Sequence, residues 1–386
     1  MRRPPLSPRL AGLGTTIFAE MSQLAQATGA INLGQGFPDE DGPIEVAEAA
    51  IAAIRAGVNQ YPPGPGTEEL RVAIAGHQKR FWGVDVDPAT EVLVTAGATE
   101  AIAASVLALC DPGDEIVAFE PTYDSYTAVA AMAGARLRAV ALQPPAYDAD
   151  VDRLAGLVTD RTRLLLLNTP HNPTGKVFSV SELEAIARLC GERDLIAVTD
   201  EVYEHLVFDG RHRPLCTFPG MADRTVTISS AGKTFSFTGW KIGWACGPAE
   251  LVSAVRTAKQ FLTYVNGAPF QPAVARGLGL ADDFYAALCE GLRAKRDLLC
   301  EGLRAAGFEV FVPQGTYFAT VDIRPVGGDD GVEFCRSLPE RCGVVGIPSS
   351  VFYEDPATGR HLVRFAFCKR TEVLTEAAER LAGLRR

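Results

Sequence analysis

Short apolar runs alternate with amphipathic, helix-like segments through the middle of the chain. Each run has the length of a buried strand, and the segment that follows it has apolar residues at helical spacing. The runs are 91–95, 115–119, 163–167, 195–199 and 225–229. This alternation is typical of an α/β fold with a mostly parallel sheet sandwiched by helices, which binds ligands beyond the carboxyl ends of its strands.

The two ends of the chain have different patterns. Helical spacing is evident in residues 15–27, 43–56, 68–82, 285–305 and 371–384, and short strands are expected at 308–312, 317–322 and 363–367. At 386 residues the chain exceeds the roughly 250–300 residues that one hydrophobic core usually serves. We therefore expect three parts: an N-terminal arm that contributes to a small domain (1–42), a large ligand-binding domain (43–284) and a C-terminal small α+β domain (285–386).

Composition narrows the class of function. A net charge of −10 argues against a nucleic-acid partner and favours a small-molecule substrate. Apolar runs such as 101–110 are about half the ~20 residues that a membrane span needs, and no signal peptide is evident, so we expect a cytoplasmic protein without a membrane partner. The nine cysteines form no C-x-x-C pair and the five histidines show no metal-binding spacing. Reduced thiols and no metal site are therefore expected.

Lys233 is the most informative candidate for chemistry. It follows the predicted strand 225–229 in the sequence Ser-Ser-Ala-Gly-Lys-Thr-Phe. A phosphate-binding P-loop would need glycine where the chain has Thr227, so that motif fails. The small and aromatic neighbours of Lys233 predict a desolvated amine with a lowered pKa, which suits imine formation with an aldehyde cofactor. A solvated surface lysine is the alternative.

Other polar residues lie at the ends of the predicted strands. Asp200 follows strand 195–199, where a carboxylate needs a cationic partner such as a protonated pyridine nitrogen; a helix cap is the alternative. Asn172 and Tyr203 could both donate hydrogen bonds to an oxygen on the same ring. Tyr123 could stack on that ring, or it could be an ordinary core aromatic.

A second group of residues is suited to anions. Gly97, Ala98 and Thr99 follow the first predicted strand and open a helix, so their N–H groups favour a phosphate, although Thr99 could instead cap the helix. Ser230 and Lys241 would add hydroxyl and ammonium donors to such a phosphate site.

Arg364 lies within the apolar strand 363–367 and needs an anionic partner. Its planar guanidinium suits a substrate α-carboxylate, and a buried ion pair with a protein carboxylate is the alternative.

The ordered set of these motifs resembles the class I/II aminotransferases of fold type I, which depend on pyridoxal 5′-phosphate (PLP), over essentially the whole chain. The motifs that carry the resemblance are Asn-Leu-Gly-Gln-Gly-Phe-Pro (32–38), Asn-Gln-Tyr (59–61), Gly-Ala-Thr-Glu-Ala (97–101), Asn-Pro-Thr-Gly (172–175), Asp-Glu-Val-Tyr (200–203) and Ser-Ala-Gly-Lys (230–233). They look like the branch of kynurenine aminotransferases and cysteine-conjugate β-lyases. Further stretches at 37–43, 61–66 and 243–248 are most similar to actinobacterial N-succinyldiaminopimelate aminotransferases.

The resemblance implies a role for each candidate residue. Lys233 would hold the cofactor covalently, Asp200 would pair with the ring nitrogen, Tyr203 and Asn172 would contact the ring oxygen, and Tyr123 would stack on the ring. The phosphate would be held by Ala98, Thr99, Ser230 and Lys241, with Tyr61 reaching it from the neighbouring subunit of a homodimer. Gly36, Asn172 and Arg364 would bind the substrate carboxylate, and Phe18 would line the entrance.

The implied reaction moves an amino group from an L-amino acid to a 2-oxo acid. N-succinyl-LL-2,6-diaminopimelate with 2-oxoglutarate is the first expectation, and a kynurenine-, glutamine- or methionine-type aminotransferase with β-lyase side activity is the alternative. Many family members carry arginine at Lys241, and kynurenine-type members tend to carry tryptophan at Phe18, which weakens the expectation of large aromatic donors. A DNA-binding regulator is disfavoured because no basic N-terminal module precedes the domain.

Overall fold

The computed structural model describes residues 6–10 and 16–385 of the chain. Its largest sheet has seven strands in the order β2-β8-β7-β6-β5-β3-β4, and only β8 runs antiparallel to the others. These strands are β2 (Val92–Thr95), β3 (Glu115–Glu120), β4 (Arg136–Ala141), β5 (Thr162–Asn168), β6 (Ile196–Asp200), β7 (Thr225–Ser230) and β8 (Gly243–Cys246). The predicted α/β fold with a mostly parallel sheet is confirmed.

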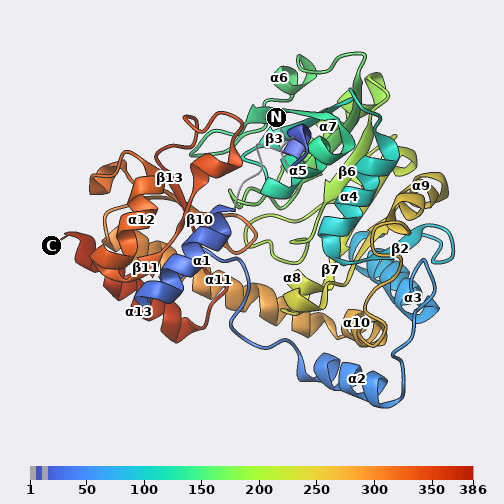
Figure 1. The fold of residues 1–386 in the computed structure, drawn as a ribbon, viewed down its shortest axis with the longest axis horizontal. Coiled ribbons are helices and arrows are strands. Elements are labelled where there is room, and N and C mark those ends of the chain that lie inside the picture. Colours follow the sequence, from blue (N-terminus) through green and yellow to red (C-terminus); the bar gives the residue numbers. More distant parts are fainter. Residues whose placement is uncertain (1–5, 11–15, 386) are drawn as a thin grey trace, which may run out of the picture.

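Helices cover both faces of this sheet because its central strands are apolar on both sides. Leu164 and Leu166 of β5 pack with α4 and α5, whereas Leu165 and Leu167 pack with α7 on the opposite face. The helices of this part are α2 (Ile44–Arg55), α3 (Glu68–His77), α4 (Gly97–Leu109), α5 (Asp124–Ala133), α6 (Val151–Ala155), α7 (Val180–Glu192), α8 (Ala231–Thr234), α9 (Ala249–Lys259) and α10 (Phe270–Leu278). Figure 1 shows the layered arrangement.

A second, smaller sheet is antiparallel and has the order β12-β13-β10-β9. Its elements are β9 (Glu309–Phe311), β10 (Phe318–Asp322), β12 (Ile347–Pro348) and β13 (Leu362–Ala366), with α11 (Asp282–Ala305), α12 (Gly331–Cys342) and α13 (Thr371–Ala382) packed around them. Near the N-terminus, α1 (Ile17–Thr28) packs on this core, and β1 (Ile31–Asn32) pairs in parallel with β11 (Val344–Val345). The first and last parts of the chain therefore lie side by side (Figure 1).

Helix α11 joins the two hydrophobic cores. Tyr285, near its start, belongs to the core under β2 and β8, whereas Leu292 and Leu299 belong to the core of the small sheet. The helix therefore crosses the predicted boundary at 284/285, and the three-part division stays a prediction. Residues 1–5 and 11–15 of the predicted N-terminal arm, including the start of its expected helix, lie outside the described residues.

Several elements were not predicted. The sequence pattern assigns no element to the antiparallel β8, the edge strand β4, or the helices α9, α10 and α12, although a family motif covers β8. The predicted helix 68–82 forms, but it changes to π-helical hydrogen bonding over Gln78–Trp82 before Gly83 ends it. All nine cysteines are free, and six of them are buried, as expected for reduced thiols. Within residues 6–10 and 16–385, no helix is both long and apolar enough to cross a membrane.

Candidate active site

A cavity of about 460 Å³ opens where the carboxyl ends of the parallel strands face the small sheet. All of the predicted site residues except Tyr61 line it: Phe18, Gly36, Gly97, Ala98, Thr99, Tyr123, Asn172, Asp200, Tyr203, Ser230, Lys233, Lys241 and Arg364. Tyr61 lies elsewhere, with 81% of its side chain exposed and its ring 5.5 Å from that of Tyr264. One chain thus brings together all but one of the predicted residues.

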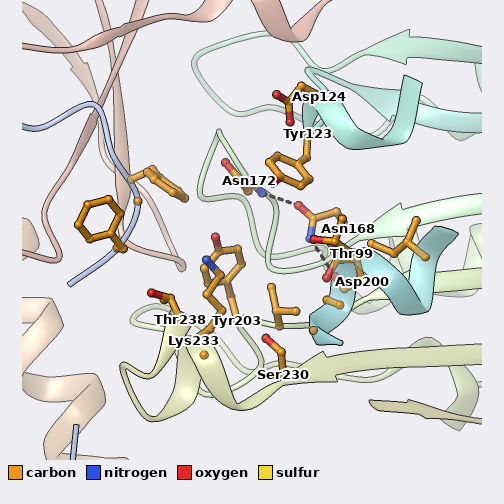
Figure 2. Close-up of a pocket in the computed structure, with 18 of the residues that line it drawn as sticks. Thr99, Tyr123, Asp124, Asn168, Asn172, Asp200, Tyr203, Ser230, Lys233 and Thr238 are labelled. Atoms are coloured by element: carbon orange, nitrogen blue, oxygen red, sulfur yellow. Dashed lines mark hydrogen bonds between the residues drawn. The ribbon is translucent and has the colours of Figure 1, made fainter. Parts of the chain in front are cut away.

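Lys233 lies on α8, the short helix that directly follows β7. Its Nζ is 5.9 Å from the ring centre of Tyr203 and 5.7 Å from that of Tyr317. Figure 2 shows Lys233 beside Tyr203. Burial lowers the pKa of Lys233, and the positive charges of Lys241 and Arg364 lower it further. The lowered pKa makes the neutral amine, the form that acts as a nucleophile or a base, more accessible than in an exposed lysine.

Asp200 ends β6 and is buried in the floor of the cavity. Its Oδ2 accepts a hydrogen bond from the hydroxyl of Tyr126 at 2.6 Å, whereas its Oδ1 has no partner among the described residues. Burial raises the pKa of Asp200 to about 6, although the bond from Tyr126 acts in the opposite direction. An unpartnered carboxylate oxygen in a buried position calls for a donor from a ligand, preferably a positively charged one.

Asn168, which ends β5, was not predicted from the sequence but holds two site segments together. Its Nδ2 donates to the carbonyl oxygen of Asp200 at 2.8 Å, and its Oδ1 accepts from the main-chain N–H of Asn172 at 2.7 Å. Dashed lines in Figure 2 mark these two bonds. Because β5 and β6 are neighbours in the sheet, this one side chain fixes the loop of Asn172 relative to Asp200.

The start of α4 forms a cradle with Lys241. Gly97 has φ +72°, and a Cβ added to it would lie 3.2 Å from the Nζ of Lys241. The lysine side chain therefore crosses directly over the first turn of the helix, whose first N–H groups have no partner within the helix. Together with Thr99 and Ser230, which also line the cavity, this arrangement suits a phosphate.

Arg364 lies in β13 on the opposite wall and is 1% exposed. It donates to Oδ1 of Asn172 and to the carbonyl oxygen of Gly34, both at 3.0 Å, while its Nε has no partner. Among the described residues no carboxylate forms an ion pair with Arg364, so the alternative of a buried protein ion pair fails. Such a guanidinium suits the carboxylate of a ligand.

Aromatic rings surround the guanidinium of Arg364. Its Cζ is 4.0 Å from the ring centre of Phe318, 5.2 Å from that of Phe352 and 5.3 Å from that of Phe18. A Cβ on Gly36 would lie 2.5 Å from Cζ of Phe318, so only glycine fits at this wall. The rings exclude water from the guanidinium and leave the side facing the cavity for an anion.

One cluster outside the cavity, formed by His77, Glu204 and His205, has residue types that could bind a metal. The spacing of these residues in the sequence does not indicate such a site. Most polar atoms of the cluster have other partners, although Nδ1 of His77 has none among the described residues. The Nε2 atoms of His77 and His205 lie 2.7 Å apart, and the carboxylate of Glu204 accepts from Ser229 at 2.6 Å and from Trp82 at 2.5 Å. These contacts explain the cluster as a buried hydrogen-bond network.

The comparisons with known proteins agree with this geometry. The family model described as aminotransferase class I and II matches residues 28–381. The chain belongs to this family. A relative from Mycobacterium tuberculosis named "Probable N-succinyldiaminopimelate aminotransferase DapC" is 58% identical, over 97% of this chain and 98% of that protein. The methionine aminotransferase of Escherichia coli is 42% identical over the full length of both proteins.

Solved structures give the same result for the fold. The N-succinyldiaminopimelate aminotransferase of Mycobacterium tuberculosis superposes with a TM-score of 0.97, over 98% of this chain and all of that one. The aspartate aminotransferase of Thermus thermophilus, at 33% identity, superposes with a TM-score of 0.91 over 99% of this chain and all of that one. The expected fold type I and the aminotransferase activity are therefore confirmed.

PLP is the cofactor of this aminotransferase, and the residues of the cavity fit it. The orphaned Oδ1 of Asp200 matches a protonated ring nitrogen, the cradle over Gly97 matches the phosphate, and Lys233 offers an amine of lowered pKa to the aldehyde. The fit supports the role expected for each side chain, and these individual roles stay proposals.

Proposed function

We propose that this aminotransferase moves the amino group of N-succinyl-LL-2,6-diaminopimelate to 2-oxoglutarate, in lysine and diaminopimelate biosynthesis. The observation that carries the proposal is the 58% identity, over nearly the whole of both chains, with the mycobacterial relative of that name. The methionine and kynurenine aminotransferases are more distant, at 42% and at 35–36% identity.

Some side chains of the cavity bind the substrate, and others hold or transfer protons. Arg364 binds the α-carboxylate of the donor together with Asn172, which it already contacts at 3.0 Å. When bound, PLP supplies an electron sink for the negative charge that develops at the donor Cα. Asp200 keeps the ring nitrogen protonated, and Nζ of Lys233 takes the proton from that Cα.

A homodimer and a cytoplasmic location are parts of the proposal. Tyr61 and its neighbour Tyr264 are both exposed, at 81% and 55%, and Phe261, three residues before Tyr264 in the chain, is 80% exposed. Such side chains are typical of a surface covered by another protein, and a second copy would cover them while bringing its Tyr61 to the neighbouring cavity. The nine free thiols support a reducing compartment.

The decisive experiment compares amino donors in a single turnover. The absorbance of bound PLP is followed after adding N-succinyl-diaminopimelate, L-kynurenine, L-methionine or L-glutamate, and the conversion rates per unit concentration are compared. The succinylated donor is expected to convert fastest. Faster conversion of kynurenine or methionine would replace the proposal with a broad amino-acid aminotransferase, and pyruvate formed from cysteine conjugates would reveal β-elimination.

Two lysine variants separate chemistry from cofactor binding. Lys233→Ala removes the covalent anchor and the base, and loss of the base alone costs roughly 10²–10⁴-fold in rate. Lys241→Ala removes only a phosphate contact, so it is expected to weaken PLP binding but to retain turnover at saturating PLP. Steady-state rates across a range of PLP concentrations test both expectations. Appreciable multiple turnover by Lys233→Ala would contradict the role of Lys233.

A further inference from the structure

Tyr126 lies on α5 and contacts Asp200 from outside the cavity lining. Its side chain is 4% exposed, and its hydroxyl donates to Oδ2 of Asp200 at 2.6 Å. Tyr126 does not line the cavity, so it is not placed to contact a ligand bound there. Its ring packs edge-on against that of Tyr123 with the centres 5.9 Å apart, which fixes the ring in place.

The two oxygens of Asp200 therefore have different surroundings. Oδ2 is held by the phenol, whereas Oδ1 has no partner among the described residues. A carboxylate without this bond could rotate about its terminal torsion, which is soft and roughly two-fold. We propose that Tyr126 is a positioning residue that holds Asp200 in its anionic form with Oδ1 turned toward the ring nitrogen of PLP. The proposal rests on the role proposed above for Asp200.

The balance of charges around Asp200 shows why one hydroxyl matters. Five titratable groups face this carboxyl: Tyr123 and Tyr126 at the start of α5, Glu201 and Tyr203 after β6, and Lys233 on α8. Burial raises the pKa of Asp200 to about 6, and Glu201 also raises it, whereas the bond from Tyr126, the main-chain N–H of Val202 and the charge of Lys233 lower it. Loss of the hydroxyl therefore moves the pKa upward, toward neutral pH.

The test measures PLP binding to the apoenzyme as a function of pH. As the pH is lowered, the affinity of Tyr126→Phe for PLP is expected to fall about one pH unit earlier than that of the wild type, which makes binding about twofold weaker at pH 7 and about fivefold weaker at pH 6. Tyr285→Phe is the matched control, because it also removes a buried hydroxyl that donates a hydrogen bond, but to the main chain of α10. The phosphate of PLP also titrates, but it does so in the same way for every variant, so the difference between variants reports on the protein.

Two further variants, Asp200→Asn and the double variant that combines Tyr126→Phe with Asp200→Asn, distinguish a failure of the role proposed for Asp200 from a failure of the inference about Tyr126. If Asp200→Asn binds PLP as the wild type does at every pH, the role of Asp200 in the proposed function is wrong. If Asp200→Asn weakens binding but Tyr126→Phe behaves like Tyr285→Phe, the inference about Tyr126 is overturned. If Tyr126 acts through Asp200, adding Tyr126→Phe to Asp200→Asn is expected to cause little further loss, whereas additive losses would contradict it.

Kinetics with the loaded enzyme give a second readout. Tyr126→Phe is expected to slow the first half-reaction several-fold, about three- to tenfold, and to leave the KM of the donor within about twofold, because the hydroxyl acts on the cofactor side and not on the substrate. A raised KM with an unchanged half-reaction rate would show a general distortion of the site and would overturn the proposal.

Discussion

At the scale of single residues, the site depends on polar atoms that the protein leaves unpaired. Oδ1 of Asp200 and Nε of Arg364 are both buried without a partner among the described residues. Such atoms are rare in folded proteins because each costs roughly 1–3 kcal/mol when it is left unsatisfied. Their position on opposite sides of one cavity indicates that a ligand with a cationic and an anionic group completes the structure.

The guanidinium of Arg364 gives the first prediction at this scale. Arg364→Lys keeps the charge but loses the planar donor pair, so kcat/KM is expected to fall about 10- to 100-fold for both donor and acceptor, since each carries an α-carboxylate. Affinity for PLP is expected to change little. Arg324→Lys is the control, because Arg324 binds Asp322 at the end of β10 and does not line the cavity. An unchanged kcat/KM in Arg364→Lys would refute its role.

The buried carboxyl of Glu204 gives a prediction about pH. Burial raises its pKa from 4.5 to about 7, so the folded protein binds this proton more tightly than the unfolded chain does. The stability that the neutral carboxyl contributes is present below about pH 4.5 and is lost as the pH rises to about 7. Glu204→Gln, which stays neutral, is therefore expected to become more stable relative to the wild type between pH 5 and pH 8.

Urea unfolding of the apoprotein at several pH values measures this difference. The gain is expected to be at most about 3 kcal/mol, and the hydrogen bonds lost from Ser229 or Trp82 add a constant that does not vary with pH. The exposed residue Glu184 provides the control variant Glu184→Gln. If the free energy of unfolding varied with pH in the same way for wild type and Glu204→Gln, ionisation of the Glu204 carboxyl would cost the folded protein little stability, and the prediction would be wrong.

At the scale of elements, the cofactor site is built where secondary-structure elements begin and end. Helix α4 begins at Gly97, whose φ of +72° favours glycine. The side chain of Lys241 packs so close to Gly97 that an added Cβ would lie 3.2 Å from its Nζ. Gly97→Ala is therefore expected to weaken PLP binding by about tenfold or more, because the new methyl group displaces the ammonium and strains the backbone. Titration of the apoenzyme with PLP measures the effect.

Gly83 offers a matched control for this change. It also has a left-handed backbone, at φ +70°, but an added Cβ would meet nothing within 4 Å. Gly83→Ala and Gly97→Ala are therefore expected to lose similar stability, about 1 kcal/mol from backbone strain, and to differ in PLP affinity. Equal affinities in the two variants would show that the cradle has no part in binding.

The sequence predicts the strand-end residues better than it predicts the elements around them. Asp200, Asn172 and Lys233 follow apolar runs, and parallel strands bring their carboxyl ends to one edge, so their meeting could be expected. The supporting residues Tyr126 and Asn168 could not be found in this way, because one is an ordinary aromatic within a helical pattern and the other ends a strand as a typical turn residue does. Their roles depend on pairs 74 and 32 residues apart.

The missed strands have a similar cause. β8 has only four residues, includes a glycine and pairs antiparallel with both β7 and β2. It is therefore not part of a βαβ unit, and the alternation of strands and helices in the sequence does not predict it. Gly243 must also pack against the start of α4, where an added Cβ would lie 2.5 Å from the carbonyl carbon of Gly97. A constraint between two segments 146 positions apart is visible only once the chain is folded.

At the scale of the whole molecule, two hydrophobic cores face each other across the cavity. The large sheet supplies Lys233 and Asp200, and the small sheet supplies Arg364. Helix α11 runs between them and packs on both cores (Figure 1). The residue proposed to bind the substrate carboxylate and the residues proposed to bind PLP therefore belong to different cores, so any relative motion of the two cores would change the distance between substrate and cofactor.

Tyr61 gives the prediction that belongs to the assembly, because it is 81% exposed and lies outside the cavity of its own chain. If it serves the neighbouring subunit, Tyr61→Ala is expected to weaken PLP binding about tenfold, whereas Tyr264→Ala, at its exposed neighbour, is expected to weaken it less.

A mixture of Tyr61→Ala and Lys233→Ala chains forms mixed dimers in which one site has both mutations and the other has none. With equal amounts and random pairing, about a quarter of all sites are intact, so activity at limiting PLP is expected to rise to about a quarter of the wild-type value. If Tyr61 instead acted within its own chain, no site in the mixture would be intact and activity would stay at the average of the two variants.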